Sequence, residues 1–191
     1  MIFGELELDR PAVRTSRRRR ILLSTILASF TRAFPGLTFQ LVADSPVTNA
    51  QAVVLHRRRY VCLYGGLAFN PSAGQDAITF TLLHETGHHL ARGCRLPWDP
   101  RLACECVADH WAVTQGINVL RTRGGTRITL AAAIRELNVI FAERINGQAR
   151  HAITNGDGCW ALQWSARRRN VLARRRPGEA GCPLADKVVS T

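Results

Sequence analysis

Two histidines and a glutamate stand at a spacing that suits hydrolysis assisted by a metal ion. His84 and His88 enclose Glu85 in the segment His-Glu-Thr-Gly-His, which has the form HExxH. Residues four apart on a helix lie on one face, so both imidazoles can bind one ion. Zinc suits this pair, because its tetrahedral shell then accepts one more protein ligand and a water molecule. Glu85 would accept the proton of that water and pass it to the leaving group.

A third protein ligand has to come from outside this motif, and two residues qualify. Cys94 stands where the longer motif HExxHxxGxxH places its last ligand. That longer motif needs a glycine to turn the chain, however, and Ala91 occupies its position. Glu105, farther along the chain, is therefore the better choice.

The surroundings of Glu105 support this choice. Glu105 shares a helical face with Asp109 in an ExxAD pattern. Cys104 and Cys106 bracket Glu105, and cysteine side chains prefer burial, so this carboxylate needs a counter-charge. A metal-bound histidine usually donates its second ring N–H to a carboxylate or carbonyl. Asp109 is the natural acceptor for that N–H of His84.

Two helices are predicted to position these groups. The first covers residues 76–92 and carries the HExxH motif, with Gly93 as its stop. The second covers residues 100–115, with Asp99 as its N-cap and Gly116 as its end. On this interpretation the two histidines and Glu105 project from neighbouring helices.

The other elements follow from hydrophobic spacing. An amphipathic helix with a solvated run of arginines at residues 17–20 ends at Pro35-Gly36. Two further helices are expected, one closing near Gly147 and one over residues 159–176. Strands are expected over residues 37–43, 52–56 and 60–64, the last two joined as a hairpin, which together predict a small antiparallel sheet.

The two motifs resemble those of a known family. HETGHH followed by ECVADHWA is similar to the glutamate-type zincins (gluzincins), and most closely to the ImmA/IrrE-type metallopeptidases. The resemblance covers roughly residues 22–112, including the order of helix, small sheet and two motif helices. It implies a zinc ion held by His84, His88 and Glu105, with Glu85 as catalytic base. It also implies an intracellular protein, such as a DNA-bound regulator, as substrate.

The expected fold class is therefore α+β. We expect a compact zincin-like domain over residues 16–176, with a small antiparallel sheet, an active-site helix and several packed helices. Residues 1–15 and 177–191 are expected to be irregular termini. At 191 residues and 46% hydrophobic composition the chain can bury a real core, which excludes a wholly disordered protein. No stretch is long enough to span a bilayer.

The net charge of +12 rests almost wholly on arginine. The arginines cluster at residues 17–20, 57–59, 167–169 and 174–176. Such clusters attract nucleic acid or acidic proteins if they share one face of the fold. The alternative is that they lie on solvated helix faces and turns, and that arginine usage reflects a GC-rich genome.

Cysteine usage bears on the compartment. The six cysteines, Cys62, Cys94, Cys104, Cys106, Cys159 and Cys182, form no CxxC pair. Three disulfides in a secreted protein are one interpretation, and buried free thiols in a reducing compartment are the simpler one. The apolar run at residues 21–30 begins late for a signal peptide and contains hydroxyl side chains. We expect a cytoplasmic protein, with a secreted or injected effector as the alternative.

Two functional hypotheses follow. The first is a zinc metallohydrolase, an endopeptidase that cleaves a protein substrate with water activated by the metal and Glu85. The second is a catalytically silent zincin scaffold that binds nucleic acid or an acidic protein through its arginine clusters.

Several other residues have weaker claims to a role. His89 and His110 point off the motif face and are expected to be packing or rim groups. His151, Tyr60 and Tyr64 are weak candidates for stabilising an oxyanion. The strand at residues 60–64 is expected to offer an edge to which an extended substrate adds as a further strand.

Overall fold

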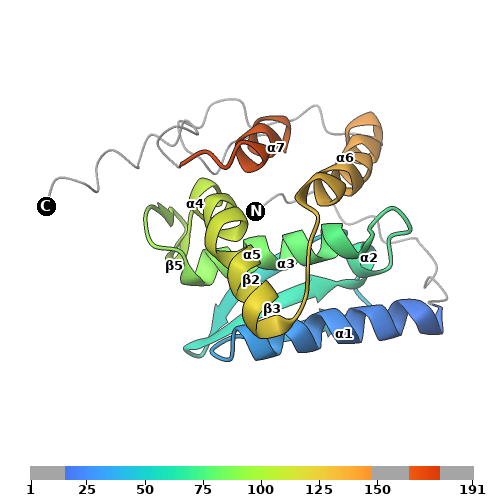
Figure 1. Ribbon diagram of the computed structural model, residues 1–191, viewed down its shortest axis with the longest axis horizontal. Helices are drawn as coiled ribbons and strands as arrows, with labels where there is room; N and C mark the ends of the chain where they lie inside the picture. Colours follow the sequence, from blue (N-terminus) through green and yellow to red (C-terminus); the bar gives the residue numbers. More distant parts are fainter. Residues whose placement is uncertain (1–15, 148–163, 177–191) are drawn as a thin grey trace, which may run out of the picture.

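A long helix, α1 (Arg17–Ala33), begins the part of the chain that the computed structural model describes, residues 16–147 and 164–176 (Figure 1). Ser16 caps this helix by accepting a hydrogen bond from the Arg19 N–H at 3.2 Å. Its apolar stripe is buried, as the spacing predicts, and includes Leu23 and Phe30. The prediction that all four arginines are solvated is wrong for Arg19. Its half-buried guanidinium donates to the Ala68 carbonyl at 2.7 Å, because the chain after the sheet returns beside this helix.

Three strands form one small sheet: β1 (Thr38–Val42), β2 (Ala50–Leu55) and β3 (Arg58–Tyr64). β2 and β3 make the predicted antiparallel hairpin, turning through His56 and Arg57, which have φ values of 48° and 63°.

The sheet departs from the prediction at β1, which pairs parallel with β3 in the order β1-β3-β2. The prediction of a wholly antiparallel sheet is thus wrong. Alternation of apolar and polar side chains indicates which face of a strand is buried, but it does not indicate which strand lies beside it. The predicted edge at residues 60–64 is also wrong, since β3 is central and β2 is an edge strand of this sheet.

The helix with the HExxH motif lies in the middle of the core. After a short helix, α2 (Gly65–Ala68), comes α3 (Gln75–Leu90), which ends two residues before the predicted position. Its side chains are buried on almost every side, including Leu82, Leu83 and Thr86. A carboxylate from a later helix, Glu136, accepts a hydrogen bond from the Ala77 N–H at 2.8 Å near the start of α3. The negative charge complements the helix dipole at that end.

The helix that carries Glu105 begins later than predicted. Residues 100–103 belong to a strand, β5 (Asp99–Ala103), paired with β4 (Arg95–Leu96), and α4 (Glu105–Trp111) follows. Asp99 is not an N-cap: it is the first residue of β5 and accepts hydrogen bonds from the backbone and side chain of Arg101. The Asp-Pro pair therefore begins a strand, although an Asp side chain that bonds the backbone two residues on is equally compatible with a helix start.

The helical path also continues past Gly116, where its end was predicted. It runs through η1 (Ala112–Gly116), α5 (Ile117–Val119) and η2 (Leu120–Gly124), which include two turns of π-helix, to Gly125 at φ 73°. Gly116 allows close packing within the helical path, because a Cβ atom at this position would lie 2.8 Å from the Trp111 ring.

A disulfide joins Cys94 to Cys104 across the β4–β5 segment. The prediction of free thiols is wrong for this pair, because folding brings together cysteines that look unrelated in the sequence. Among the described residues, Cys62 and Cys106 form no disulfide; Cys62 is half-buried and Cys106 is buried. Cys159 and Cys182 lie outside the described residues.

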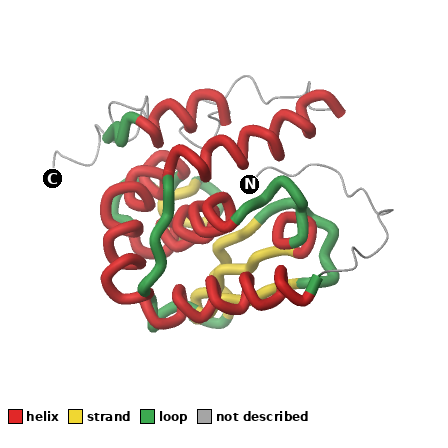
Figure 2. The backbone as a smooth tube through the Cα atoms, turned by 45° about the vertical axis from the view of Figure 1, so that its right-hand side comes forward, coloured by secondary structure: helices red, strands yellow, loops and turns green. Residues whose placement is uncertain are grey.

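Two helices cover the side of α3 that faces away from α1 (Figures 1 and 2). The predicted helix closing at Gly147 is confirmed as α6 (Leu130–Gly147), with Ile134 and Leu137 buried. The last predicted helix is found as α7 (Trp164–Leu172), which ends four residues before its predicted end. Residues 159–163 of that prediction, like both predicted irregular termini, lie outside the described residues. Among the helices that the structure describes, none combines the length and apolar character needed to cross a bilayer.

Candidate metal centre

The three predicted ligands come together between α3 and α4. His84 Nε2 lies 3.0 Å from His88 Nε2 and 3.1 Å from Glu105 Oε2, and His88 Nε2 lies 3.5 Å from Glu105 Oε1. Tetrahedral zinc with bonds of about 2.0–2.1 Å separates its ligand atoms by about 3.3 Å. The three side chains are also buried, and their donor atoms lie close enough together to hold such an ion.

Hydrogen bonds at the far ring nitrogens aim both imidazoles at this point. His84 Nδ1 lies 2.8 Å from Asp109 Oδ1, and His88 Nδ1 lies 2.6 Å from the Ala103 carbonyl oxygen. Because both partners are acceptors, each Nδ1 carries a proton, and Nε2 is the ring nitrogen that can bind a metal ion. Without a metal ion, a proton on His84 Nε2 can be donated to His88 Nε2 at 3.0 Å or to Glu105 Oε2 at 3.1 Å, and a bound metal ion would take the place of that proton.

Close packing of the two helices makes this convergence possible. Gly87, between the two histidines, lies against Ala108, and a Cβ atom on Gly87 would be 2.7 Å from the Ala108 carbonyl oxygen. Ala108 itself is fully buried. Since Glu105 and Asp109 flank Ala108 on α4, this contact brings both carboxylates to the histidine face. The glycine in the motif is therefore required for space.

Glu85 is held beside the three ligands by the edge strand. Its Oε2 accepts a hydrogen bond from the Ala52 N–H of β2 at 2.7 Å, and its Oε1 lies 3.9 Å from His84 Nε2. Burial raises the pKa of Glu85 to about 7, although the charge at His84 opposes that rise. A carboxylate with a pKa near neutrality is suited to accept a proton and release it again.

Arg167 of α7 enters the same cluster, and the sequence did not single it out. Its NH1 lies 3.1 Å from Glu105 Oε2, while Nε and NH2 form a two-pronged pair with Asp109, each at 2.9 Å. NH2 is also 3.3 Å from both ring nitrogens of His84. The buried Glu105 carboxylate did predict a counter-charge, but nothing along the chain distinguished Arg167 from the other clustered arginines.

This guanidinium favours the ionised form of both carboxylates. Burial alone would raise the pKa of Glu105, but Arg167 and the two histidines together outweigh burial and hold that pKa well below the usual range. The pKa of Asp109 is lowered to about 2 against the effect of burial, again chiefly by Arg167. Both groups are therefore ionised, as a metal ligand and its supporting acceptor must be.

The two imidazoles differ in their affinity for protons. Burial lowers the pKa of His88 to about 4, so it is neutral at physiological pH. Burial acts in the same direction on His84, but Asp109 and Glu105 outweigh it and raise the pKa of His84 to about 10. Metal uptake at this centre would therefore release a proton from His84.

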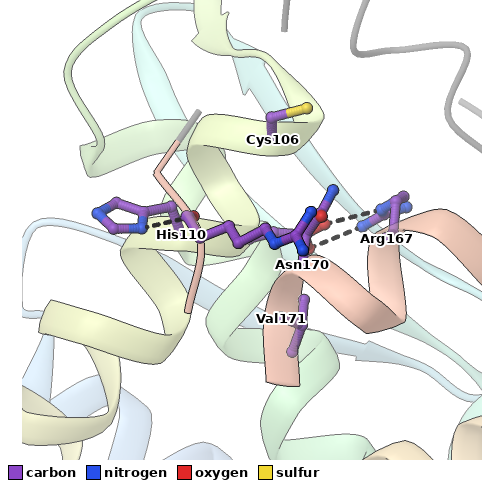
Figure 3. Close-up of a pocket in the computed structure, with 7 residues that line it drawn as sticks. Cys106, His110, Arg167, Asn170 and Val171 are labelled. Atoms are coloured by element: carbon purple, nitrogen blue, oxygen red, sulfur yellow. Dashed lines mark hydrogen bonds and ion pairs between the residues drawn. The ribbon is translucent and has the colours of Figure 1, made fainter. Parts of the chain in front are cut away.

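A narrow pocket opens beside the cluster, between α4 and α7. Figure 3 shows Arg167 at its wall, with the dashed lines of its pair with Asp109. The lining residues are Cys106, Asp109, His110, Arg167, Asn170, Val171 and Arg175.

The weaker candidates have other contacts. Cys94 is bonded to Cys104, so its sulfur is not available as a third ligand. His110 donates from Nδ1 to the Arg175 carbonyl at 3.0 Å, in keeping with a rim position. The Tyr64 hydroxyl donates to Gln51 at 2.9 Å. His151 lies outside the described residues, and the oxyanion roles of Tyr60 and Tyr64 stay predictions.

His89 is a buried packing group, which leads to a prediction on acid stability. Its Nε2 donates to the Tyr60 carbonyl at 2.8 Å, and among the described residues its Nδ1 has no hydrogen-bond partner. Burial lowers the pKa of His89 from 6.5 to about 4. The unfolded chain therefore binds a proton more readily, and this group costs stability as the pH falls from about 6.5 to about 4.

Replacing His89 by glutamine, whose amide can also donate to Tyr60, should reduce that loss. Urea unfolding of wild type and H89Q at pH 7 and pH 5, with EDTA present, measures this loss of stability. A loss of stability in H89Q as large as in the wild type would assign the acid sensitivity to other groups.

Comparison of the chain with protein-family models, with curated proteins and with solved structures found no match. The likeness to gluzincins thus depends on the two motifs alone.

Proposed function

We propose that this protein is a zinc-dependent metallohydrolase that cleaves peptide bonds. The observation that carries the proposal is the convergence of the two Nε2 atoms on Glu105, with each Nδ1 bonded to an acceptor. A buried donor set of two imidazoles and one carboxylate is typical of catalytic zinc.

Zinc bound there would polarise the substrate carbonyl and lower the pKa of its bound water towards neutrality. The chain's own residues supply the proton transfers. Glu85 Oε2 is engaged by Ala52, so Oε1, which faces His84, is the oxygen that accepts the proton of the attacking water. Glu85 then donates this proton to the leaving amine. Asp109 and the Ala103 carbonyl keep the two imidazoles oriented throughout.

The position of β2 favours an extended peptide as substrate. β2 is an edge strand of the three-stranded sheet, and its Ala52 contacts Glu85 directly. A peptide that added to this edge would pass the proposed centre with its backbone in register. Cleavage of an intracellular regulator, such as a DNA-bound one, which the family resemblance implies, is the finer form of this proposal.

The second hypothesis, a silent scaffold that binds nucleic acid or an acidic protein, has less support. Arg167 and Arg19 come from two of the predicted basic clusters, and both direct their guanidinium groups at the protein's own acceptors. Arg57 to Arg59 at the hairpin are exposed, as solvated turn residues are.

Metal content tests the proposal. We expect purified wild-type protein to hold about one zinc ion per chain, and H84A and E105A to fall below about a tenth of that, because each loses a ligand atom. Elemental mass spectrometry after dialysis against trace zinc gives the measurement. H110A is the control, since His110 lies off the ligand face, and it should retain zinc. Equal zinc in all four proteins, or none in any, would refute the centre.

A further inference from the structure

Arg167 joins the last described helix to the metal-ligating groups. Its side chain is 13% exposed, and its guanidinium contacts Glu105, Asp109 and His84. Further contacts attach the rest of α7. Val171 is buried, Arg168 donates to Asn138 of α6 at 3.3 Å, and His110 donates to the Arg175 carbonyl beyond the helix.

The guanidinium and a metal ion would use the same ligand atoms. Arg167 NH1 lies 3.1 Å from Glu105 Oε2, the oxygen nearest His84 Nε2. With metal–ligand bonds of about 2.0–2.2 Å, an ion on that oxygen would lie within about 5.3 Å of NH1. Two cations at that separation, among buried side chains that water screens poorly, repel strongly.

We propose that Arg167 is a tethered competitor of the metal, and that α7 is an inhibitory helix of the active site. This inference rests on the proposed zinc centre and concerns its regulation. Seating of Arg167 lowers the metal affinity and covers the side of Glu105 and His84 that faces α7. Metal loading weakens the docking of α7 by the same factor, since the coupling of two binding events is reciprocal.

Zinc affinity tests the proposal directly. Dissociation constants for zinc alone would be measured by competition with a chelating dye in wild type, R167Q and R169Q. R167Q should bind zinc at least about tenfold more tightly than wild type, because it removes the competing charge but keeps a polar side chain. R169Q, which removes an exposed arginine from the same helix, should stay within about twofold of wild type. Unchanged or weaker binding by R167Q would overturn the proposal.

Hydrogen exchange of wild-type protein gives a second, independent measurement, which also serves if R167Q does not fold. Zinc should accelerate exchange of the α7 amides, residues 164–172, while leaving those of α1 unchanged. Protection of α7 by zinc would show that Arg167 supports the loaded centre, contrary to the proposal.

The results separate this inference from the proposed function. If wild type binds zinc through His84 and Glu105 but R167Q binds zinc no more tightly, only the inhibitory role fails. If neither wild type nor R167Q binds zinc, both fail. Zinc binding seen in R167Q alone would support both.

Discussion

Replacement of Glu85 by glutamine is expected to abolish peptide cleavage while zinc binding persists. Glutamine has the same shape, and its amide oxygen can still accept the Ala52 N–H, but it cannot take a proton from water. General-base catalysis contributes about 10²- to 10⁴-fold, so cleavage should fall by that factor. Turnover of fluorescent casein by zinc-loaded protein, with zinc content measured on the same samples, provides the test.

The matched control for E85Q is D44N, the same chemical change at an exposed loop residue. D44N should cleave at the wild-type rate. If E85Q turned over at the wild-type rate with zinc bound, Glu85 would not be the base, and the proposed mechanism would be wrong even though the centre exists.

Replacement of Gly87 by alanine should damage both stability and the metal centre. The added Cβ atom would lie 2.7 Å from the Ala108 carbonyl oxygen and 3.0 Å from its Cα, and backbone atoms cannot move aside as a side-chain tip can. We expect α3 and α4 to separate, at a cost of about 1–3 kcal/mol in the free energy of unfolding. Because Glu105 moves with α4, zinc affinity should fall in the same variant.

Urea unfolding and a zinc titration measure these two effects of G87A. G36A is the control, because a Cβ atom at Gly36 meets nothing within 4 Å. It should unfold at nearly the wild-type urea concentration and bind zinc normally. A G87A protein as stable as wild type would show that alanine's helix propensity offsets the contact, and would contradict the account of helix packing given above.

Sequence alone determined the parts of this protein that depend on local spacing. The HExxH segment predicted a helix that brings His84 and His88 onto one face, because that periodicity belongs to any α-helix. Glu105 and Asp109 were predicted to share a face for the same reason, and in the structure both contact His84. The buried stripe of α1 and the β2–β3 hairpin likewise follow from short-range patterns.

Other features were decided only by tertiary structure, because they depend on contacts between distant segments. Asp99-Pro100 suits the start of a strand as well as the start of a helix, and only pairing with β4 selected the strand. The central place of β3 depends on the strand that came earlier, β1, and not on its own residues. Arg167 contacts Glu105 and Asp109 because α7 docks beside α4. This contact joins segments far apart in the chain, so no periodic pattern in the sequence predicts it. Local spacing thus specified the candidate metal ligands, and tertiary packing decided that the positively charged side chain facing them is that of Arg167.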